Sequence, residues 1–435
     1  MFKAVLNLKL HWQILIALAL AVIAGLLAGK TASIAGITFF SMFTFLGALF
    51  MNALKMVIIP LVVSSIIVGI AGIGGSEGLA RMGGRTLLYY MTTSLFAILI
   101  GLFFVNFLSP GIIDGQPAQL VLGLDAEQGK IAAAKVGERG VGDIADVFLN
   151  MVPANIVAAG ANGQLLGLIF FSILFGYFIS KIQEAYAEAQ YNFWQGISEV
   201  MMKITDVIMK FAPIGVFALV AKVIAGMDDG EIFNLASALG WFFLTVILAL
   251  MVHTFIILPL LLKFVARVSP VRHFQAMSPA LVTAFSTASS SATLPLTMEC
   301  VEKNAGVSNK TSSFVLPLGA TVNMDGTALY ECVAAMFIAQ AYGIELSFTV
   351  QFTIVLIALL TSIGVAGIPA ASLVAITIIL SVIGLPVEAL GLILAVDRIL
   401  DMFRTAVNIF SDSCGAVIIG RLEGEEGILQ ETRAL

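Results

Sequence analysis

The sequence predicts an all-α membrane protein that crosses the lipid bilayer many times. Of its 435 residues, 60% are hydrophobic and 11% are charged, whereas about 25% of residues are charged in an average soluble domain. Several apolar stretches reach the roughly 20 residues that a helix needs to span the hydrocarbon core, the clearest being 12–29, 87–108, 236–262 and 349–383. With a mean hydropathy of +1.04, the chain has too little polar surface to cover a water-soluble globule.

The composition argues against several other classes of protein. A net charge of -5 provides no basic face for nucleic acid. The three cysteines lack a CxxC spacing and the three histidines are scattered, so we expect neither a disulfide framework nor a zinc site. Without an HExxH motif or a plausibly spaced Ser/His pair, we do not expect an enzyme. The acidic residues near the C-terminus, Glu423, Glu425 and Glu426, are expected to be solvated.

Basic residues mark one side of the membrane. The first nine residues are basic like the start of a signal peptide, but no convincing cleavage site follows, so we expect a retained first helix. Cytoplasmic loops are enriched in Lys and Arg, which predicts cytoplasmic termini in a plasma or inner membrane. The loop 109–146 and the acidic turn 228–231 are expected on the opposite side. The basic residues in question are Lys3, Lys9, Arg81, Arg85, Lys181, Lys263, Arg267 and Arg272.

After residue 268, polar residues interrupt the apolar stretches at two corresponding places. One interruption, 286–295, lies within 274–301 and precedes a helix at 311–341. The other, 362–369, lies within 349–383 and precedes a helix at 387–420. Paired interrupted segments indicate a transporter's binding site near the midplane, so we interpret them as oppositely directed re-entrant hairpins. Short kinked helices in a channel wall are the alternative.

The last predicted helix has one ionic face. At about 100° per residue, five polar side chains fall within roughly 80° of arc. They are Asp397, Asp401, Arg404, Asn408 and Asp412. A charge at the centre of a membrane helix costs at least about 2.5 kcal/mol, so this face must look into a protein interior or a watery cavity. Structural ion pairing with Arg404 is one interpretation, but the excess of carboxylates favours cation binding.

The helix at 311–341 carries polar residues at mid-depth. Gly319, Thr321, Asn323, Asp325 and Thr327 favour local unwinding, and the exposed carbonyls together with Asn and Asp oxygens are ligands that suit a hard cation such as Na⁺.

Glu331 lies on the same stripe as Asn323 and Thr327. A buried glutamate can carry a proton, and a glutamate held by a structural hydrogen bond would give the same pattern.

These residues resemble the dicarboxylate/amino acid:cation symporter family, which includes archaeal aspartate transporters and mammalian excitatory amino acid transporters. The resemblance covers essentially the whole chain. It rests on TASSSATLP (287–295), NMDGTALYE (323–331), GVAGIP (364–369) and DxxxDxxRTxxNxxxD (397–412). It implies eight transmembrane helices plus two hairpins with inverted repeats, a homotrimer, and an elevator-type movement of a transport domain against a scaffold.

The resemblance also implies how the chain is divided. The scaffold takes residues 1–75 and, together with the outer loop, 109–225. The transport domain takes helix three at 76–108 and the core at 226–421, which contains helix six, both hairpins and helices seven and eight. Residues 422–435 form a cytoplasmic tail.

The resemblance implies an acidic amino acid, aspartate or glutamate, as the substrate. Asp401 would hold its amino group and Arg404 its side-chain carboxylate, which agrees with the preference of guanidinium for carboxylate. Further substrate contacts are implied at the two hairpin tips and on helices seven and eight. They are Ser289, Ser290, Ser291, Thr327, Val365, Ala366, Gly367, Thr405 and Asn408.

Na⁺ is the coupling ion that the resemblance implies, and no organic cofactor is expected. One Na⁺ site would use Gly319, Asn323, Asn408 and Asp412, and a second would use Thr321 with carbonyls of the second hairpin. A third site would take five residues, which are Tyr90, Thr93, Ser94, Asn323 and Asp325.

The chain departs from the family pattern at a few positions. Ala288 and Met402 stand where archaeal and mammalian members, respectively, carry an arginine, and Arg398 is a candidate to replace that charge. Glu331 matches the proton-carrying position of the mammalian members, so H⁺ coupling stays open. The alternatives are a proton-driven carrier of the same substrates, a C4-dicarboxylate carrier and an ion channel.

Overall fold

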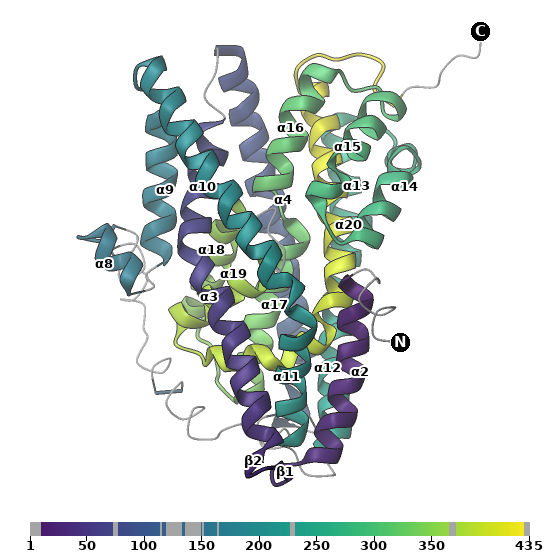
Figure 1. Cartoon of the computed structure of the whole chain (residues 1–435). Helices are drawn as coiled ribbons and strands as arrows, with labels where there is room; N and C mark the ends of the chain where they lie inside the picture. Colours follow the sequence, from purple (N-terminus) through teal and green to yellow (C-terminus); the bar gives the residue numbers. More distant parts are fainter. Residues whose placement is uncertain are drawn as a thin grey trace.

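The structure, a computed structural model, describes residues 10–72, 77–113, 115–118, 133–134, 149, 152–162, 165–226, 231–364 and 371–429. Helices dominate it (Figure 1). Two short β-hairpins, β1 (Ser33–Ile34) with β2 (Ile37–Thr38) and β3 (Ile112–Ile113) with β4 (Gln116–Pro117), join or end helices. The predicted tip of the second hairpin, Val365 to Gly367, lies outside the described residues.

The first half of the chain forms one group of packed helices. Its helices are α2 (Leu10–Ala28), α3 (Phe39–Ala71), α8 (Ile156–Ala161), α9 (Leu165–Ile179), α10 (Glu184–Lys210) and α11 (Ala212–Ala225). Helix α11 packs on α2 and α3, and α3 packs on α9 and α10. The α3–α11 contact is very close, since a Cβ on Gly215 would overlap the ring of Phe50.

The helix α4 (Glu77–Leu108) belongs by its contacts to the second half of the chain. It packs on α12 (Glu231–Val252) and on α17 (Asp325–Ala341). Helix α12 continues to Ala266 through η1 (His253–Ile257), α13 (Leu258–Leu261) and η2 (Leu262–Ala266), the first and last of these being π-helical. A π-turn inserts an extra residue and often marks a functional position.

The two interrupted segments are each pairs of packed helices. The first is α14 (Pro270–Thr287) and α15 (Ser290–Glu299), continued by η3 (Cys300–Asn304), and its turn is made by Ala288 in the left-handed conformation. The second is α18 (Phe348–Gly364) and α19 (Ala371–Ile383), which contact each other. The 3-10 turn η4 (Val387–Ala389) then leads to α20 (Leu390–Leu422).

The local unwinding expected in the helix at 311–341 is confirmed. The chain forms two helices there, α16 (Asn309–Val322) and α17, with extended backbone at Asn323 (φ -114°, ψ 97°) between them.

Two helices of the described chain are long and apolar enough to cross a membrane by themselves. They are Arg81–Leu108 and Leu235–Ala266, and a third results if the bent pair Glu184–Ile208 and Ala212–Ala225 counts as one span. The expected eight spans therefore are not all recognisable by length and apolarity. Broken helices such as α16–α17 and polar ones such as α20 fail this test because they carry unwound backbone or charged side chains.

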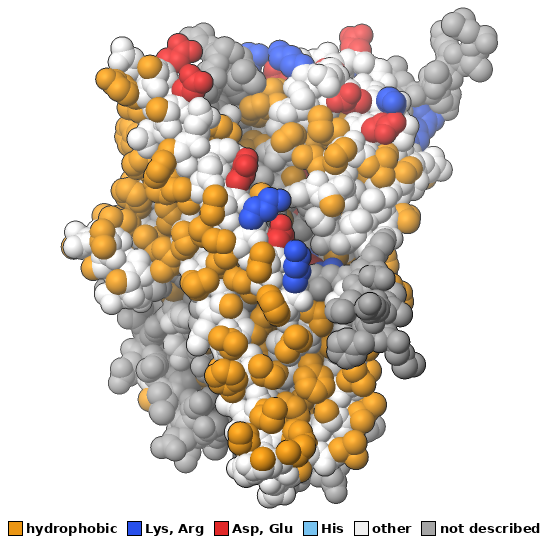
Figure 2. All heavy atoms as spheres, in the orientation of Figure 1, with side chains coloured by type: hydrophobic (Ala, Val, Ile, Leu, Met, Phe, Trp, Pro, Cys, Tyr) orange, Lys and Arg blue, Asp and Glu red, His pale blue; other side chains and the backbone are white. Residues whose placement is uncertain are grey.

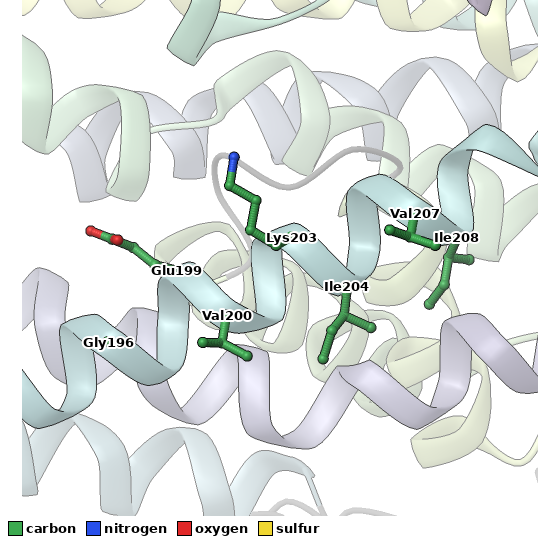
Figure 3. A pocket seen from close by; sticks show the side chains of 7 residues that line it. All are labelled: Gly196, Glu199, Val200, Lys203, Ile204, Val207 and Ile208. Atoms are coloured by element: carbon green, nitrogen blue, oxygen red, sulfur yellow. The ribbon is translucent and has the colours of Figure 1, made fainter.

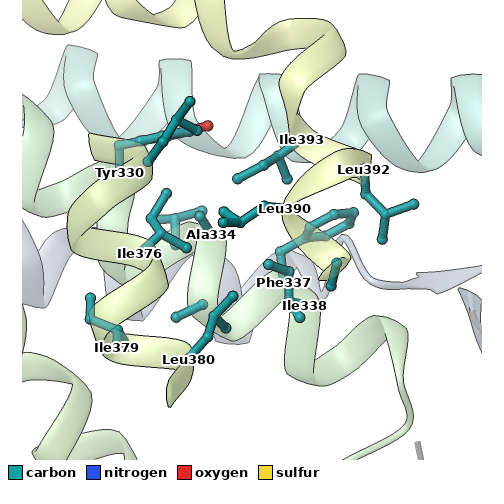
Figure 4. Packing of buried hydrophobic residues seen from close by; sticks show 14 of the residues in the cluster. Tyr330, Ala334, Phe337, Ile338, Ile376, Ile379, Leu380, Leu390, Leu392 and Ile393 are labelled. Atoms are coloured by element: carbon teal, nitrogen blue, oxygen red, sulfur yellow. The ribbon is translucent and has the colours of Figure 1, made fainter. Parts of the chain in front are cut away.

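Helix α17 lies at the centre of the fold. All of its residues except Gln340 are buried. Its side chains Ala334 and Phe337 pack with Ile376 of α19 and Leu390 of α20 (Figure 4), and the ring of Phe337 lies 4.6 Å from that of Phe242 on α12. This apolar packing fixes the position of α17, and with it the position of the polar residues at its N-terminal end.

The acidic C-terminal region is not simply solvated, so that expectation was wrong. The C-terminal strap, Glu423–Leu429, folds back on the molecule. Glu423 pairs with Arg85 at 2.7 Å, while the Glu425 carboxylate accepts hydrogen bonds from the backbone and hydroxyl of Ser308 at the start of α16. Ile428 is 2% exposed. The strap thus caps one helix and covers apolar surface, whereas Glu426 is exposed as expected.

Replacing Glu425 with Gln should lower the thermal midpoint, because the carboxylate caps the N-terminus of α16. Caps contribute about 1 kcal/mol, less where solvent screens the charge. Partial burial alone would raise the pKa of Glu425, but hydrogen bonds from Ser308 and Thr311 bring it below its ordinary value. Because the pKa of Glu425 is lower in the folded state, its carboxylate stabilises the fold fully above the unfolded-state pKa of about 4.3. This stabilisation is lost as the pH falls through the folded-state pKa.

The measurement is thermal unfolding of parent and variant between pH 7 and pH 3.5. The difference should be full at pH 7 and should shrink below about pH 4. Glu426→Gln is the matched control, since this neighbouring carboxylate is exposed. Equal midpoints for the parent and Glu425→Gln at pH 7 would refute the capping role.

Candidate functional site

Arg404 is the buried centre of the polar face of α20. The residue is 0% exposed, and its Nη2 lies 3.1 Å from Oδ1 of both Asp397 and Asp401. Its guanidinium lies over the ring of Tyr330 on α17, with 3.9 Å between Cζ and the ring centroid. Because an arginine cannot lose its proton in a protein, these neighbours must compensate a permanent charge.

The guanidinium keeps unused donors. Within the described part of the chain, its Nε and Nη1 are buried and have no hydrogen-bond partner. A buried donor without a partner costs about 1–3 kcal/mol. Asp401, whose side chain is 23% exposed and whose other oxygen accepts from Arg398 Nη1 at 2.8 Å, opens the same place to solvent. The arrangement suits a small molecule that brings an anionic group to Arg404 and a cationic group to Asp401.

Asn408 joins this region to the start of α17. Its Nδ2 donates to Thr327 Oγ1 at 3.1 Å, and its Oδ1 accepts from the backbone N–H of Gly326 at 2.8 Å. Thr405 instead donates to the backbone carbonyl of Asp401, one turn back on its own helix. The sequence-predicted residues Thr327, Asp401, Arg404 and Asn408 are therefore neighbours along α17 and α20.

A second polar cluster surrounds the fully buried carboxylate of Asp325. Oδ1 accepts from Ser94 of α4 at 2.7 Å, and Oδ2 accepts from Ser411 of α20 at 2.6 Å. Nε2 of His253, in the π-helical turn η1, lies 2.9 Å from the same Oδ2. Three other elements thus converge on this carboxylate at the start of α17.

Asn323 and Asp412 form the adjoining part of this cluster. Asn323 Nδ2 donates to Asp412 Oδ1 at 2.8 Å, and Thr93 Oγ1 lies 3.4 Å from Asn323 Oδ1. Gly319 allows the close approach, since a Cβ there would lie 2.5 Å from Asp412 Oδ1 and 2.6 Å from the hydroxyl of Tyr90.

The residues of the expected first and third Na⁺ sites are thus brought together, except that the side chain of Asn408 bonds Gly326 and Thr327 instead. Carboxylate, amide and hydroxyl oxygens at membrane depth, with α16 ending beside them, are what a desolvated hard cation requires.

Other predicted residues lie apart from these clusters. Thr321 is exposed and donates to the carbonyl of Leu318 on its own helix. Ser289 caps α15 by accepting from the backbone of Ala292, while Ser290 is buried and Ser291 exposed. Val365, Ala366 and Gly367 lie outside the described residues.

The first hairpin nevertheless lies next to the Arg404 site. The ring of Phe285 near the hairpin turn lies 5.0 Å from that of Phe403, the residue before Arg404. The first hairpin therefore packs against α20 at the residue before Arg404, on a side of the helix away from the polar face.

Glu331 is 1% exposed and accepts a hydrogen bond from Thr361 of α18 at 2.9 Å. It therefore links α17 to the second hairpin, and its carboxylate is held in a fully enclosed position.

Sequence reasoning missed His253, Ser411 and Tyr330. His253 was judged a scattered histidine, and its place in a π-turn leaves no signal in the sequence. Ser411 precedes Asp412 on the polar face and was readable from helical spacing, since it follows Asn408 by three residues. Tyr330 adjoins Glu331 within the motif at 323–331, but only the packing of α17 on α20 reveals its contact with Arg404.

Comparison with known proteins gives a consistent picture. The model of the sodium:dicarboxylate symporter family matches residues 10–422. Excitatory amino acid transporter 3 of Homo sapiens is 36% identical over an alignment of 461 residues. The alignment covers 96% of this chain and 87% of that protein. The proton/glutamate-aspartate symporter of Escherichia coli is 34% identical over 423 residues, with 96% and 94% covered. The proton/sodium-glutamate symport protein of Bacillus subtilis is 36% identical over 383 residues, with 87% and 86% covered.

Replacing Gly319 with Ala should disturb the Asn323–Asp412 part of the cluster, because the added methyl overlaps the Asp412 carboxylate and the Tyr90 hydroxyl. Overpacking of this kind costs about 1–3 kcal/mol, so cation affinity should fall by roughly 5- to 150-fold if that cost falls on the bound geometry. The measurement is Na⁺ titration of the purified protein, followed by protection against thermal unfolding. Gly84→Ala, which meets no atom within 4 Å, is the control. Identical Na⁺ titrations for the parent and Gly319→Ala would contradict a cation site here.

Proposed function

This chain belongs to the sodium:dicarboxylate symporter family, and on that premise we propose that it is a secondary active symporter that takes up aspartate or glutamate together with Na⁺. The observation that carries the proposal is the buried Arg404 guanidinium with two unpartnered nitrogens beside the partly exposed Asp401. The opposed charges of this site agree with the family, which is one of symporters and not of enzymes.

The charges of the site favour an acidic amino acid over its rivals. Arg404 receives the side-chain carboxylate of the substrate, and Asp401 receives its ammonium group. A C4-dicarboxylate would place a second anion near Asp401, and a neutral amino acid would bring no carboxylate to the unpartnered Nε and Nη1 of Arg404. A pure channel has no use for this pair.

The hairpin turns complete the site in this proposal. Backbone N–H groups at the serine-rich turn, Ser289 to Ser291, bind the α-carboxylate, and Val365 to Gly367 close the second gate. The start of α15 supports the first assignment, since helix N-termini attract anions. Thr327, Thr405 and Asn408 contribute polar contacts from helices α17 and α20.

Na⁺ ions occupy the clusters around Asp325 and Asp412 in this proposal. Two buried carboxylates at membrane depth favour a cation. The ligands are Gly319, Asn323, Asn408 and Asp412 for one ion, and Tyr90, Thr93, Ser94, Asn323 and Asp325 for another. Thr321 joins a third ion held by carbonyls of the second hairpin.

One observation favours a proton-driven carrier as the second candidate. Asp325 already has Ser94, Ser411 and His253 as partners, so the carboxylate is satisfied by hydrogen bonds alone. In addition, a relative that is 34% identical carries the name proton/glutamate-aspartate symporter.

From its membership of the family, we also propose that the chain has eight membrane helices and two re-entrant hairpins and works by an elevator movement. The mutual packing of α2, α3, α9, α10 and α11 supports a scaffold at 1–75 and 109–225. The packing of α4 on α12 and α17 supports placing 76–108 with the transport domain at 226–421. Both termini are assigned to the cytoplasm of a plasma or inner membrane.

The outer face of α10 supports the homotrimer. Exposed side chains of alternating charge follow one another along it at helical spacing, namely Glu199, Lys203, Asp206 and Lys210. Figure 2 shows acidic and basic side chains alternating across an otherwise apolar face. Among the described residues, a hollow of about 660 Å³ there is lined by α10 alone (Figure 3), and a second copy of the chain packed on this face would cover it.

The deciding experiment is uptake of labelled aspartate and glutamate into proteoliposomes under imposed Na⁺ or H⁺ gradients. The proposal expects uptake that requires inward Na⁺ and is saturable in both amino acids. Uptake driven by a proton gradient in the absence of Na⁺ would favour the proton-driven carrier, and substrate-independent Na⁺ current would favour a channel.

Replacing Arg404 with Cys should reduce aspartate uptake by on the order of 100-fold, because truncating one member of a buried charge pair costs about 2–5 kcal/mol. Uptake of neutral amino acids should be retained or gained. Arg398→Gln is the comparison, since Arg398 also pairs with Asp401 but is not assigned to the substrate. An unchanged preference for acidic over neutral substrates in Arg404→Cys would exclude this role.

Glu331→Gln tests H⁺ coupling, since this buried carboxylate is the candidate proton carrier. Na⁺-driven uptake should persist in the variant while acidification of the vesicle lumen during uptake disappears. Thr361→Val is the matched control, because it removes the hydrogen bond to Glu331 and leaves the carboxyl group in place. If both variants lose uptake equally, or if the parent itself shows no acidification, Glu331 is a structural residue.

A further inference from the structure

Arg398 brings a second guanidinium to the substrate site, and the function proposed above gives it no contact with the substrate. It lies one turn before Asp401 on α20, and its Nη1 is 2.8 Å from Asp401 Oδ2. Arg404 lies one turn after Asp401, and its Nη2 is 3.1 Å from Asp401 Oδ1. The Asp401 carboxylate therefore lies between two guanidinium groups, with one at each oxygen.

The two arginines are not held equally. The side chain of Arg404 is 1% exposed, and it is held by Asp397, Asp401 and the ring of Tyr330. Arg398 has a side chain that is 16% exposed, and Asp401 is its one ion-pair partner in the described chain. Its Nε is buried there without a hydrogen-bond partner. Because a buried donor without a partner is unfavourable, Arg398 has a free N–H group to offer to an anion.

The charges around Asp401 favour an anion at Arg398. Asp401 is shared by both arginines, whereas Asp397 pairs with Arg404. An ammonium group that binds Asp401 adds a third positive charge beside this one carboxylate. A carboxylate on the same ligand is therefore attracted to Arg398, since guanidinium groups suit carboxylate oxygens through charge-assisted hydrogen bonds.

The order of these side chains along α20 matches the order of charges on an acidic amino acid. Arg398, Asp401 and Arg404 follow one another at three-residue spacing, which makes them neighbours on the helix surface. In aspartate, the carbon that carries the ammonium group also carries the α-carboxylate. An ammonium group at Asp401 thus places the α-carboxylate directly beside it, toward Arg398, and leaves the side-chain carboxylate for the more deeply buried Arg404.

We propose that Arg398 binds the α-carboxylate of the substrate and thereby selects α-amino acids. This inference rests on the function proposed above and adds a contact to it. The guanidinium takes one carboxylate oxygen and leaves the other to the backbone N–H groups of the serine-rich turn. Asp401 stays available to the ammonium group, because a carboxylate has about four acceptor positions and each of its oxygens accepts one bond from an arginine.

The test compares two amides of aspartate that remove one charge each. Isoasparagine lacks the charge of the α-carboxylate, and asparagine lacks that of the side chain. Their inhibition constants, and that of aspartate, are measured against uptake of labelled aspartate into proteoliposomes. Arg398→Gln should lower the preference for aspartate over isoasparagine by about tenfold, as expected for a lost hydrogen bond to a charged group. Its preference for aspartate over asparagine should stay that of the parent.

Two further variants separate the contact from general effects of charge. Arg398→Lys should keep most of the preference for aspartate over isoasparagine, because an ammonium group also binds a carboxylate. Lys303→Gln removes an exposed lysine that pairs with Glu299, away from this site, and should behave like the parent. For a variant that does not transport, protection of the purified protein from thermal unfolding by the same three ligands gives the same two preferences.

The other outcomes would each overturn the proposal. If Arg398 only holds Asp401 in place, Arg398→Gln should weaken all three ligands by the same factor. If Arg398 competes with the ammonium group, all three should bind more tightly. A reduced preference for aspartate over asparagine would mean that Arg398 contacts the side-chain carboxylate instead. A parent protein that neither takes up aspartate nor is protected by it would refute the proposed function itself, and this contact with it.

Discussion

The burial of one permanent positive charge, on Arg404, constrains the architecture around it. The guanidinium needs Asp397, Asp401 and the face of Tyr330 as close neighbours, since an uncompensated charge in a membrane interior is too costly to keep. Helix α20 therefore cannot face lipid along this stripe. It must be enclosed by protein, which α17 provides through Tyr330 and Thr327, and the extended backbone at Asn323 between α16 and α17 is tolerated because it is buried as well.

Much of this arrangement could be predicted from the sequence, because it depends on spacing within single segments. The stripe from Asp397 to Asp412 follows from the 3.6-residue period, and the break at Asn323 follows from a run of residues that disfavour a continuous helix. What could not be predicted depends on contacts between distant segments. His253 reaches Asp325 only through a π-turn, and Glu425 becomes a helix cap only because the strap returns to Ser308. Thr321 was expected to bind an ion because of its place between Gly319 and Asn323. Its hydroxyl instead donates to the carbonyl of Leu318 on its own helix, which the sequence does not reveal.

The candidate ion cluster and the candidate substrate site share a structural connection. Asn408 accepts from the backbone of Gly326, the residue after Asp325, and donates to Thr327, while lying one turn beyond Arg404 on α20. A cation that changed the geometry at Asp325 would move the first turn of α17 and hence the partners of Asn408. By linkage, any such effect on substrate affinity must be matched by an equal effect of substrate on cation affinity.

The kind of partner around Asp325 suits a site that binds and releases an ion. The hydroxyl groups of Ser94 and Ser411 and the imidazole of His253 surround it, and none of the three is a fixed positive charge such as an arginine. A fixed cation would satisfy the carboxylate permanently and exclude an ion, as Arg404 does for Asp397. Hydroxyl groups can rotate to offer oxygen in place of O–H, so Ser94 and Ser411 can stabilise the carboxylate when no ion is present and coordinate an ion when one arrives. This reversibility is the property that a coupling site needs and that a structural ion pair lacks.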